Sequence, residues 1–358
     1  MIGSLMAQGT PKVVRVGSRL VGDGQPVVIV AEAGVNHDGS LDKAFRLVEA
    51  AKAAGADLVK FQVFRAAELV TAGAPAAAYQ QAGGAVNQRQ LLENLELSDA
   101  DFACIADHCR QQGIGFLATP FSPSDVDRLE RLGVPAIKIA STDLNNPLLL
   151  KRAAATGLPL IVSTGASTAE EIADCLALLR AWGVQDRLLL LHCISGYPAP
   201  LEAANLRAIA TLRQAADVPC GFSDHTRSTE VAGWAVAAGA CVLEKHFTLD
   251  RSQPGPDHAM SLSPSELAEY VGCARRAEGA LGDGRLGFNP VEADVRAAAR
   301  KSVVAVRPIA AGTTLTAEML TIKRPGGGIG PEWLDALPGR RVVVDVAPDT
   351  VLTWDMVR

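Results

Sequence analysis

Eight short apolar runs, separated by segments of helical character, constrain the fold of this 358-residue chain more than any other feature. Runs that are hydrophobic almost throughout are typical of parallel strands buried on both faces. Eight alternations of strand and helix favour a closed barrel over an open doubly wound sheet. We therefore predict a (β/α)8 TIM barrel whose strands cover residues 27–34, 58–64, 115–121, 136–141, 159–165, 188–195, 221–226 and 241–249.

The segments between these runs are predicted to be amphipathic helices. One covers Leu41 to Ala54 and ends at Gly55, and another begins after Ser98, which has the side chain of an N-cap. No GxGxxG motif and no P-loop follows any of the runs, which excludes the usual dinucleotide- and nucleotide-binding sites.

The C-terminal part of the chain has a different pattern. From Lys301 onward, short strand-like runs alternate with Gly and Pro every few residues, which indicates a small all-β module. Such a module is too short to build a large core alone, so we expect it to pack on another surface. The predicted organisation is an N-terminal extension over 1–26, the barrel over 27–282, a linker over 283–300 and the module over 301–358.

Composition excludes several classes of protein. The net charge of −5 leaves no basic surface for nucleic acid, and no stretch reaches the length of about 18 apolar residues that a membrane span needs. The seven cysteines are scattered and never spaced as CxxC, which indicates reduced thiols and not a disulfide framework or a zinc site. The N-terminus lacks the apolar core of a signal peptide, so we expect a cytoplasmic protein.

Two predicted strands end in clusters of titratable side chains, and TIM-barrel active sites lie at the carboxyl ends of the strands. Side chains alternate along a strand, so Glu244 and His246 share one face while Lys245 points the other way. His225 and His246 are then placed to converge from neighbouring strands as two imidazole ligands of a divalent metal. The clusters are Ser223-Asp224-His225 and Glu244-Lys245-His246.

The other predicted strands also end in polar side chains. They are Glu32, Lys60, Gln62, Thr119, Lys138, Ser141, Ser163, Thr164, His192 and Ser195. Three lysines, counting Lys245, and several hydroxyls at one mouth predict a site for a phosphate or carboxylate anion in an otherwise acidic protein. A lysine on a barrel strand is alternatively a Schiff-base nucleophile, as in aldolases.

The connection over residues 65–97 is far longer than a usual βα loop. Connections of this length are commonly lids or binding loops, although a mobile surface loop is the alternative. Tyr79, Gln80 and Asn87 are its candidates for contact with a sugar.

Several motifs together carry a resemblance to a known family. They are AEAGVNHDGSLDKAFRLVEAAKAAGADLVKFQ, VPAIKIAS, LIVSTGAS, LHCISGYPAP, GFSDHT, EKHFTLDRSQPGPDH and KRPGGGI. In this order they resemble the sialic acid synthase family, whose members condense phosphoenolpyruvate with an N-acetylated amino sugar. The C-terminal module resembles the antifreeze-like (SAF, β-clip) domain of that family.

The resemblance implies a role for each matching position. His225 and His246 match ligands of manganese, with Mg²⁺ or Co²⁺ as other possible ions. Tyr197 and Asp257 match sugar-side residues, and Arg324 matches an arginine that reaches the sugar in the neighbouring subunit of a domain-swapped homodimer. The phosphoenolpyruvate-binding positions are Lys60, Thr119, Lys138, Ser141, Ser163, Ser195 and Ser223. The carboxylates that stabilise charge or move protons are Glu32, Asp143 and Glu244.

Two positions depart from the family pattern. Thr142-Asp143 stands where many members have Gly-Glu, so the carboxylate is one methylene shorter. Ser195 stands where some members have Asn, which shortens the reach of its hydrogen bond. Both positions face the substrates in the family and bear on the identity of the sugar.

The resemblance implies condensation of phosphoenolpyruvate with N-acetylmannosamine to give N-acetylneuraminate and phosphate. Synthesis of legionaminate or pseudaminate from a related sugar is the nearest alternative. A Schiff-base aldolase and a non-catalytic carbohydrate- or ice-binding protein are the alternatives from other classes.

Overall fold

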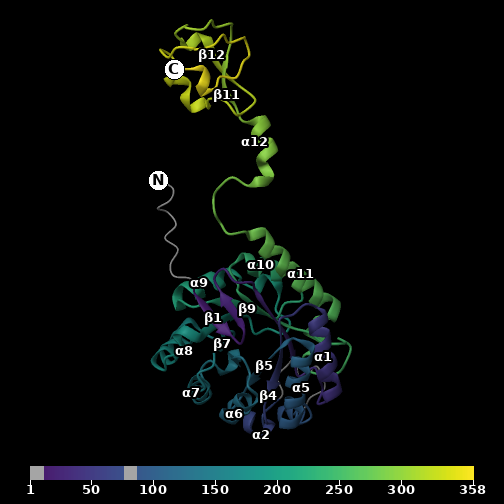
Figure 1. The fold of residues 1–358 in the computed structure, drawn as a ribbon. Coiled ribbons are helices and arrows are strands. Elements are labelled where there is room, and N and C mark those ends of the chain that lie inside the picture. The colour runs from purple at the N-terminus through teal and green to yellow at the C-terminus, as the bar shows by residue number, and fades with distance from the viewer. Residues whose placement is uncertain (1–11, 76–86) are drawn as a thin grey trace. The chain divides into compact units, whose positions relative to one another are not determined.

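The computed structural model describes residues 12–75 and 87–358. The chain divides into two compact units, residues 1–283 and 284–358 (Figure 1). The residues predicted as a linker therefore belong mainly to the second unit. Within the described ranges, no helix combines the length and the hydropathy that a membrane-spanning helix requires.

The first unit is the predicted barrel. Within the described residues, eight parallel strands form one sheet with the order β5-β4-β3-β10-β9-β8-β7-β6. The two ends of this order, β5 and β6, also contact each other. The strands are β3 (Val28–Gly34), β4 (Leu58–Val63), β5 (Gly115–Pro120), β6 (Ile137–Ile139), β7 (Leu160–Ser163), β8 (Leu188–Cys193), β9 (Cys220–Asp224) and β10 (Val242–His246). They confirm the predicted runs.

Helices surround the sheet (Figure 1). They are α1 (Leu41–Ala53), α2 (Ala66–Leu69), α4 (Gln88–Glu93), α5 (Asp99–Gln112), α6 (Pro123–Leu132), α7 (Pro147–Ala155), α8 (Ala169–Ala181), α9 (Arg207–Ala216), α10 (Val231–Ala237) and α11 (Pro264–Leu281). Short 3-10 turns are η2 (Ser141–Asp143), η3 (Gln185–Arg187), η4 (Leu201–Ala203) and η5 (His258–Met260). Ser98 caps α5 as predicted, in a reciprocal pair of hydrogen bonds with Asp101. Gly113 ends α5 with φ +66°, a conformation that favours glycine.

A hairpin closes the amino-terminal end of the barrel. Its strands β1 (Val13–Val16) and β2 (Arg19–Gly22) are antiparallel. Val14, Val16 and Val21 are buried in one cluster with the interior side chains at the start of the barrel strands, such as Val28 and Leu58. Within the predicted N-terminal extension, the hairpin over residues 13–22 therefore adds to the core of the barrel.

The second unit contains α12 (Ala293–Ala299) and a small antiparallel pair, β11 (Ser302–Ala305) with β12 (Leu320–Lys323). Isolated bridges such as Ile309 to Val346 and short 3-10 turns complete the module. These turns are η6 (Pro290–Glu292), η7 (Ala317–Met319), η8 (Pro331–Ala336) and η9 (Trp354–Met356). Its own core includes Val303, Ile329 and Val342, which are fully buried. The predicted small β module is confirmed.

Candidate functional site

Four charged side chains meet inside the carboxyl end of the barrel. The Lys60 Nζ lies 2.9 Å from the Glu32 Oε2 and 3.5 Å from the Glu244 Oε1. The Lys138 Nζ lies 3.8 Å from the same Glu244 oxygen. All four residues are buried, so Glu244 is shared by the two lysines in a medium that screens charge poorly.

Hydroxyl groups complete this charged cluster. The Lys60 Nζ donates a hydrogen bond to the Thr119 Oγ1 at 3.0 Å, and the Lys138 Nζ donates to the Ser163 Oγ at 2.6 Å. The Ser223 Oγ donates to the Glu244 Oε1 at 3.1 Å. Strand alternation from β4, β5, β6, β7, β9 and β10 therefore brings the predicted lysines and hydroxyls together, with the two ammonium groups held in fixed positions.

The charges of the cluster shift one another's pKa values. Burial would lower the pKa of Lys60, but Glu244 and Glu32 outweigh it and hold that pKa above its ordinary value. Burial lowers the pKa of Lys138, and Glu244 offsets only part of that effect. Burial would raise the pKa of Glu244, but Lys138 and Lys60 hold it below its usual range. Burial raises the pKa of Glu32 despite the opposing charge of Lys60. Glu244 is thus the carboxylate best stabilised as an anion.

The two predicted imidazoles lie side by side at the edge of this cluster, with ring centroids 5.3 Å apart. The His225 Nδ1 is 2.8 Å from the Ile194 carbonyl oxygen, which only accepts, so this nitrogen carries a proton, and in the neutral imidazole the Nε2 keeps a lone pair. The His246 Nδ1 is buried, lacks a hydrogen-bond partner among the described residues, and lies 3.7 Å from the Asp257 Oδ2. The Tyr197 ring covers His225 at 4.4 Å between centroids.

This donor set fits a divalent cation. One imidazole has its tautomer fixed by a carbonyl, as is usual for metal-binding histidines, and the other has an unused ring nitrogen. In the parts of the chain that the structure describes, no group of three or more His, Cys, Asp or Glu side chains has the arrangement of a metal site. A cation held by His225 and His246 would therefore take its remaining ligands from substrate or water.

Asp257, Gln62 and Glu32 surround Gly34 at the end of β3. A Cβ on Gly34 would lie 3.3 Å from the Asp257 Oδ2, the Gln62 Nε2 and the Glu32 Oε1, and its φ of +53° also favours glycine. Burial, with a contribution from Glu32, raises the pKa of Asp257 to about 7. Asp257 is therefore placed between the charged cluster and the imidazoles.

Cys193 is a residue of the site that sequence reasoning missed. A Cβ on Gly165 would lie 2.9 Å from the Cys193 Sγ and the Ser141 Oγ, and closer still to the Ser195 Oγ, so these three side chains converge. The Cys193 Sγ also lies 3.7 Å from the His225 Nδ1. The signal was its spacing of two from Ser195, which puts both side chains on one face of the strand predicted over residues 188–195.

Two predicted residues lie on the outer face of the sheet. Lys245 is bonded to Asp224 on the outer face of the sheet, so the expectation that three lysines converge is wrong for Lys245. His192 also faces outward, with its Nε2 2.9 Å from the Ala204 carbonyl oxygen. Asp143 accepts a hydrogen bond from the Asn146 Nδ2 at 3.0 Å, in the turn before α7.

Four further candidates were identified from the sequence. Asn87 caps α4, where its side chain accepts from the Arg89 and Gln90 backbone. Tyr79 and Gln80 lie outside the described residues. Arg324 is exposed in the second unit.

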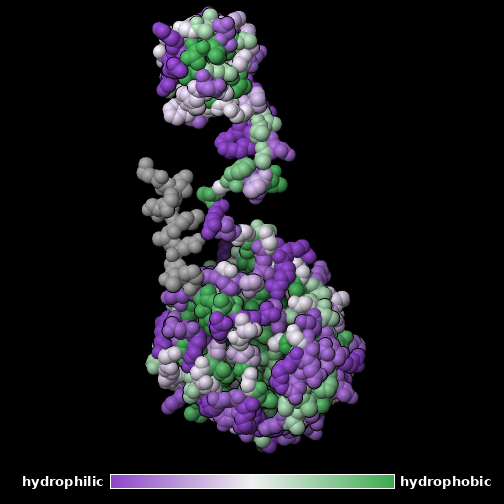
Figure 2. Space-filling view, viewed as in Figure 1, coloured by the Kyte–Doolittle hydropathy of each residue, from purple (hydrophilic) through white to green (hydrophobic). Residues whose placement is uncertain are grey.

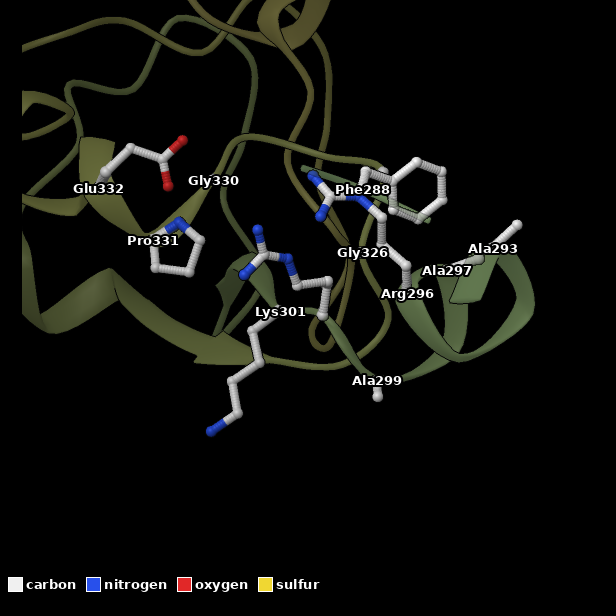
Figure 3. Close-up of a pocket in the computed structure, with 12 residues that line it drawn as sticks. Phe288, Ala293, Arg296, Ala297, Ala299, Lys301, Gly326, Gly330, Pro331 and Glu332 are labelled. Atoms are coloured by element: carbon white, nitrogen blue, oxygen red, sulfur yellow. The ribbon is translucent and has the colours of Figure 1, made fainter. Parts of the chain in front are cut away.

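The second unit has a cavity of its own, of about 880 Å³, between α12 and the loop over 326–332. The Arg296 guanidinium stacks on the Phe288 ring at 5.2 Å, and the Lys301 ammonium points away from Glu332 (Figure 3). This cavity contains no residue of the barrel and none of the predicted site residues.

The space-filling view shows hydrophilic and hydrophobic residues interspersed on the visible face of the barrel (Figure 2). The charged cluster in the barrel mouth therefore remains the candidate site.

Family models and individual relatives both relate this chain to one family of sugar acid synthases. Residues 47–286 match the model of the NeuB family, and residues 300–358 match that of the SAF domain. The N,N'-diacetyllegionaminic acid synthase of Legionella pneumophila is 39% identical, over 93% of this chain and 95% of that protein. The N-acetylneuraminate-9-phosphate synthase of Homo sapiens is 34% identical, over 95% of each chain.

A solved structure agrees with these sequence matches. The N-acetylneuraminic acid synthetase of Leptospira borgpetersenii, crystallised with citrate, superimposes with a TM-score of 0.72 and 34% identity. The match covers 80% of this chain and 96% of that one. Fold, site residues and relatives lead to one conclusion: this chain is a member of the NeuB family and ends in a SAF domain.

Proposed function

We propose that this chain condenses phosphoenolpyruvate with the open-chain form of an N-acetylated amino hexose, giving a nine-carbon sugar acid and phosphate. The observation that carries the proposal is the buried cluster of Lys60 and Lys138 beside His225 and His246. Two ammonium groups, each fixed by a hydroxyl, suit the phosphate and carboxylate of one small substrate. The names of the relatives support the same reaction class.

The chain's own groups match the charges that the reaction develops. The C3 of phosphoenolpyruvate forms a bond to the aldehyde carbon, whose oxygen takes up a proton. Water adds to C2, and the bond between C2 and the phosphate oxygen breaks with its electrons leaving on phosphate. To Glu244 and Glu32, the two carboxylates paired with Lys60, we assign the stabilisation of positive charge at C2 and the uptake of the protons of water. Asp143 has its contacts with Asn146 and is assigned no step.

His225 and His246 would hold a divalent cation, for which we propose Mn²⁺, with Mg²⁺ or Co²⁺ as possible substitutes. When bound, the cation would supply Lewis-acid polarisation of the acceptor's carbonyl group. Tyr197 and Asp257 lie next to the imidazoles and would contact the sugar. A buried carboxyl such as Asp257 suits the hydroxyl or amide hydrogen of an acceptor, because a buried polar group needs a partner.

Two acceptors are proposed for this site. N-acetylmannosamine would give N-acetylneuraminate. A six-carbon sugar with two acetamido groups would give a diacetyllegionaminate, since removing the three carbons of phosphoenolpyruvate from that product leaves such a sugar. The second acceptor is favoured by 39% identity to a legionaminic acid synthase, against 34% to an N-acetylneuraminate-9-phosphate synthase. A pseudaminic acid synthase of Campylobacter jejuni is also 34% identical, so its stereoisomeric acceptor belongs in the same panel.

The test is phosphate release from phosphoenolpyruvate across a panel of hexosamines, with added Mn²⁺ and after chelation. We expect release with an N-acetylated amino hexose, loss on chelation, and recovery on adding Mn²⁺. His246→Ala should be inactive. The matched control is His192→Asn, which removes an imidazole from the outer face of the sheet and should remain active. Phosphate release without any sugar, or full activity in His246→Ala, would contradict the proposal.

A Schiff-base aldolase is the second candidate, and one observation favours it. Burial lowers the pKa of Lys138, and an amine nucleophile must be unprotonated to attack a carbonyl. Borohydride added with pyruvate would then attach the substrate covalently to Lys138. Under the condensation proposal the protein mass stays unchanged in this experiment.

We also propose that the active form is a domain-swapped homodimer, in which Arg324 of one chain serves the barrel of the other. Residues 284–358 hold ten Lys and Arg side chains against eight Asp and Glu, whereas the whole chain has a net charge of −5. The barrel portion is therefore acidic and the second unit basic, a charge complementarity that favours association.

A further inference from the structure

A buried ion pair lies behind the two imidazoles, on the outer face of the sheet. Lys245 of β10 is in register with Asp224 of β9. The Lys245 Nζ is 2.9 Å from the Asp224 Oδ2, and the two side chains are 1% and 0% exposed. Strand alternation turns both away from His225 and His246. The pair is therefore connected to the two imidazoles through the backbone and not by direct contact.

The ammonium group of Lys245 ties together the residues on both sides of His225. Besides Asp224, it donates a hydrogen bond to the Thr226 carbonyl oxygen. The Thr226 backbone N–H in turn donates to the Asp224 Oδ1 at 2.8 Å. Because Lys245 directly precedes His246, one side chain connects the backbone around one imidazole to the backbone of the other.

Helix α11 closes the remaining side of this arrangement. The Tyr270 ring lies 5.4 Å from the Lys245 Nζ, and Tyr270 is fully buried. The ammonium group is therefore enclosed by a carboxylate, a carbonyl and an aromatic face, which leaves it little freedom to move. These contacts link the carboxyl ends of β9 and β10 to each other and to α11.

We propose that Lys245 and Asp224 are positioning residues that set the spacing of His225 and His246, and thereby the affinity of the barrel mouth for a divalent cation. The inference rests on the metal site of the proposed function. Groups that orient metal-binding histidines typically change metal affinity by about 10- to 100-fold. A buried ion pair, in contrast, adds little net stability relative to a well-packed apolar pair. The effect of removing both charges should therefore appear in metal affinity and not in folding.

The test is the double variant Asp224→Asn with Lys245→Met, titrated with Mn²⁺ alone by calorimetry in the absence of substrates. The amide still accepts the Thr226 N–H, and Met keeps most of the alkyl volume of Lys. We expect the Kd for Mn²⁺ to rise about 10- to 100-fold. At saturating Mn²⁺, the KM for phosphoenolpyruvate should stay near that of the wild type, because Lys60 and Lys138 lie on other strands and both substituted side chains point away from Ser223 and Glu244.

Two control variants make the result specific. Arg275→Met breaks the pair of Arg275 with Asp57, 2.7 Å apart near the amino-terminal end of the barrel, and should leave the Kd for Mn²⁺ unchanged. His246→Ala should abolish Mn²⁺ binding. If wild-type binding does not depend on His246, the metal site itself is wrong, and this inference falls with it.

If binding depends on His246 but the double variant binds Mn²⁺ as tightly as the wild type, the positioning role alone is wrong. Should the double variant not fold, Asp224→Glu keeps both charges of the pair but lengthens the carboxylate side chain by one methylene, which displaces its bonds to Lys245 and Thr226. Its Kd for Mn²⁺ is expected to rise at least about 3-fold, below the range for losing both groups. An unchanged Kd in that variant would overturn the inference.

Discussion

In the barrel mouth, the carboxylate of Glu244 is shared by the ammonium groups of two lysines. Lys60 in turn neutralises Glu32, so each charge in the cluster depends on the others. Breaking such a buried arrangement by removing one member leaves an uncompensated charge, which typically costs about 3–5 kcal/mol. A substitution in this cluster is therefore expected to change both the free energy of unfolding and the KM for phosphoenolpyruvate. These two quantities can be measured separately.

Lys60→Met is expected to lower the unfolding free energy by about 3–5 kcal/mol and to raise the KM for phosphoenolpyruvate at least about 100-fold. Adding Glu32→Gln removes the stranded carboxylate and should restore much of the stability without restoring the KM. Urea unfolding and steady-state phosphate release measure the two quantities. Recovery of both in the double variant would show that Lys60 serves only the fold.

His37 lies in the turn after β3 and is fully buried. Its Nδ1 accepts a hydrogen bond from the Gly39 N–H at 3.1 Å, and its Nε2 has no hydrogen-bond partner within the described ranges. Burial lowers the pKa of His37 to about 4, with Asp38 opposing the shift. The folded protein therefore keeps this imidazole neutral under conditions in which the unfolded chain protonates it.

The free energy of unfolding therefore depends on pH through His37. The contribution of neutral His37 to the unfolding free energy is complete above the unfolded pKa of about 6.5. It is lost as pH falls toward about 4, because the His37 imidazole binds a proton in the unfolded state and not in the folded state. The shift corresponds to about 3 kcal/mol of unfolding free energy. His37→Asn should remove this loss on acidification, as measured by urea unfolding between pH 7 and pH 4. The control His108→Asn, on α5, should retain it, and an unchanged slope in His37→Asn would contradict the assignment.

Which individual side chains lie in the barrel mouth was harder to predict than the strands and helices. The lysines, hydroxyls and imidazoles of the mouth could be identified because they follow apolar runs, and a closed barrel brings all strand ends to one place. Lys245 was grouped with them although alternation already turned it outward. Cys193 was missed because it was interpreted only as one of seven scattered thiols and not by its spacing from Ser195, and its contact with His225 depends on the spacing of two strands.

The strands and most helices of the barrel could be predicted from hydrophobic runs and capping residues. The hairpin over β1 and β2 could not, because strands of four residues are too short to show alternation. Its burial depends on the open end of the barrel, which no local pattern encodes. The helices α2 and α4 within the long 65–97 connection were also missed, because helices of four and six residues are too short to show a helical period.

Val21 tests the role of this hairpin. Val21→Ala removes two methyl groups from a side chain that is 1% exposed, and is expected to lower the unfolding free energy by about 2 kcal/mol. Leu20→Ala is the matched control, because Leu20 is 41% exposed and should change stability by less than about 0.5 kcal/mol. Both should keep the wild-type kcat/KM, since the site is at the other end of the barrel. Equal losses in urea unfolding would show that the hairpin is not part of the core.

At the scale of the whole molecule, the proposed exchange of C-terminal domains predicts complementation between two inactive chains. Lys60→Ala should inactivate the barrel, and Arg324→Ala should inactivate the proposed contribution of the SAF domain. In a swapped heterodimer, one site combines an intact barrel with an intact Arg324. Under random pairing, about a quarter of all sites should then recover activity after co-expression. If Arg324 acts on its own barrel, every site carries a lesion and the mixture stays inactive.

The central claim is that the barrel joins carbon to carbon and releases phosphate by breaking the C–O bond of phosphoenolpyruvate. The most direct measurement is mass spectrometry of both products after turnover in ¹⁸O-labelled water, with Mn²⁺ and the acceptor that the panel identifies. A nine-carbon sugar acid that carries the label, together with unlabelled phosphate, is the predicted result. Labelled phosphate, or phosphate without a sugar acid, would contradict the account.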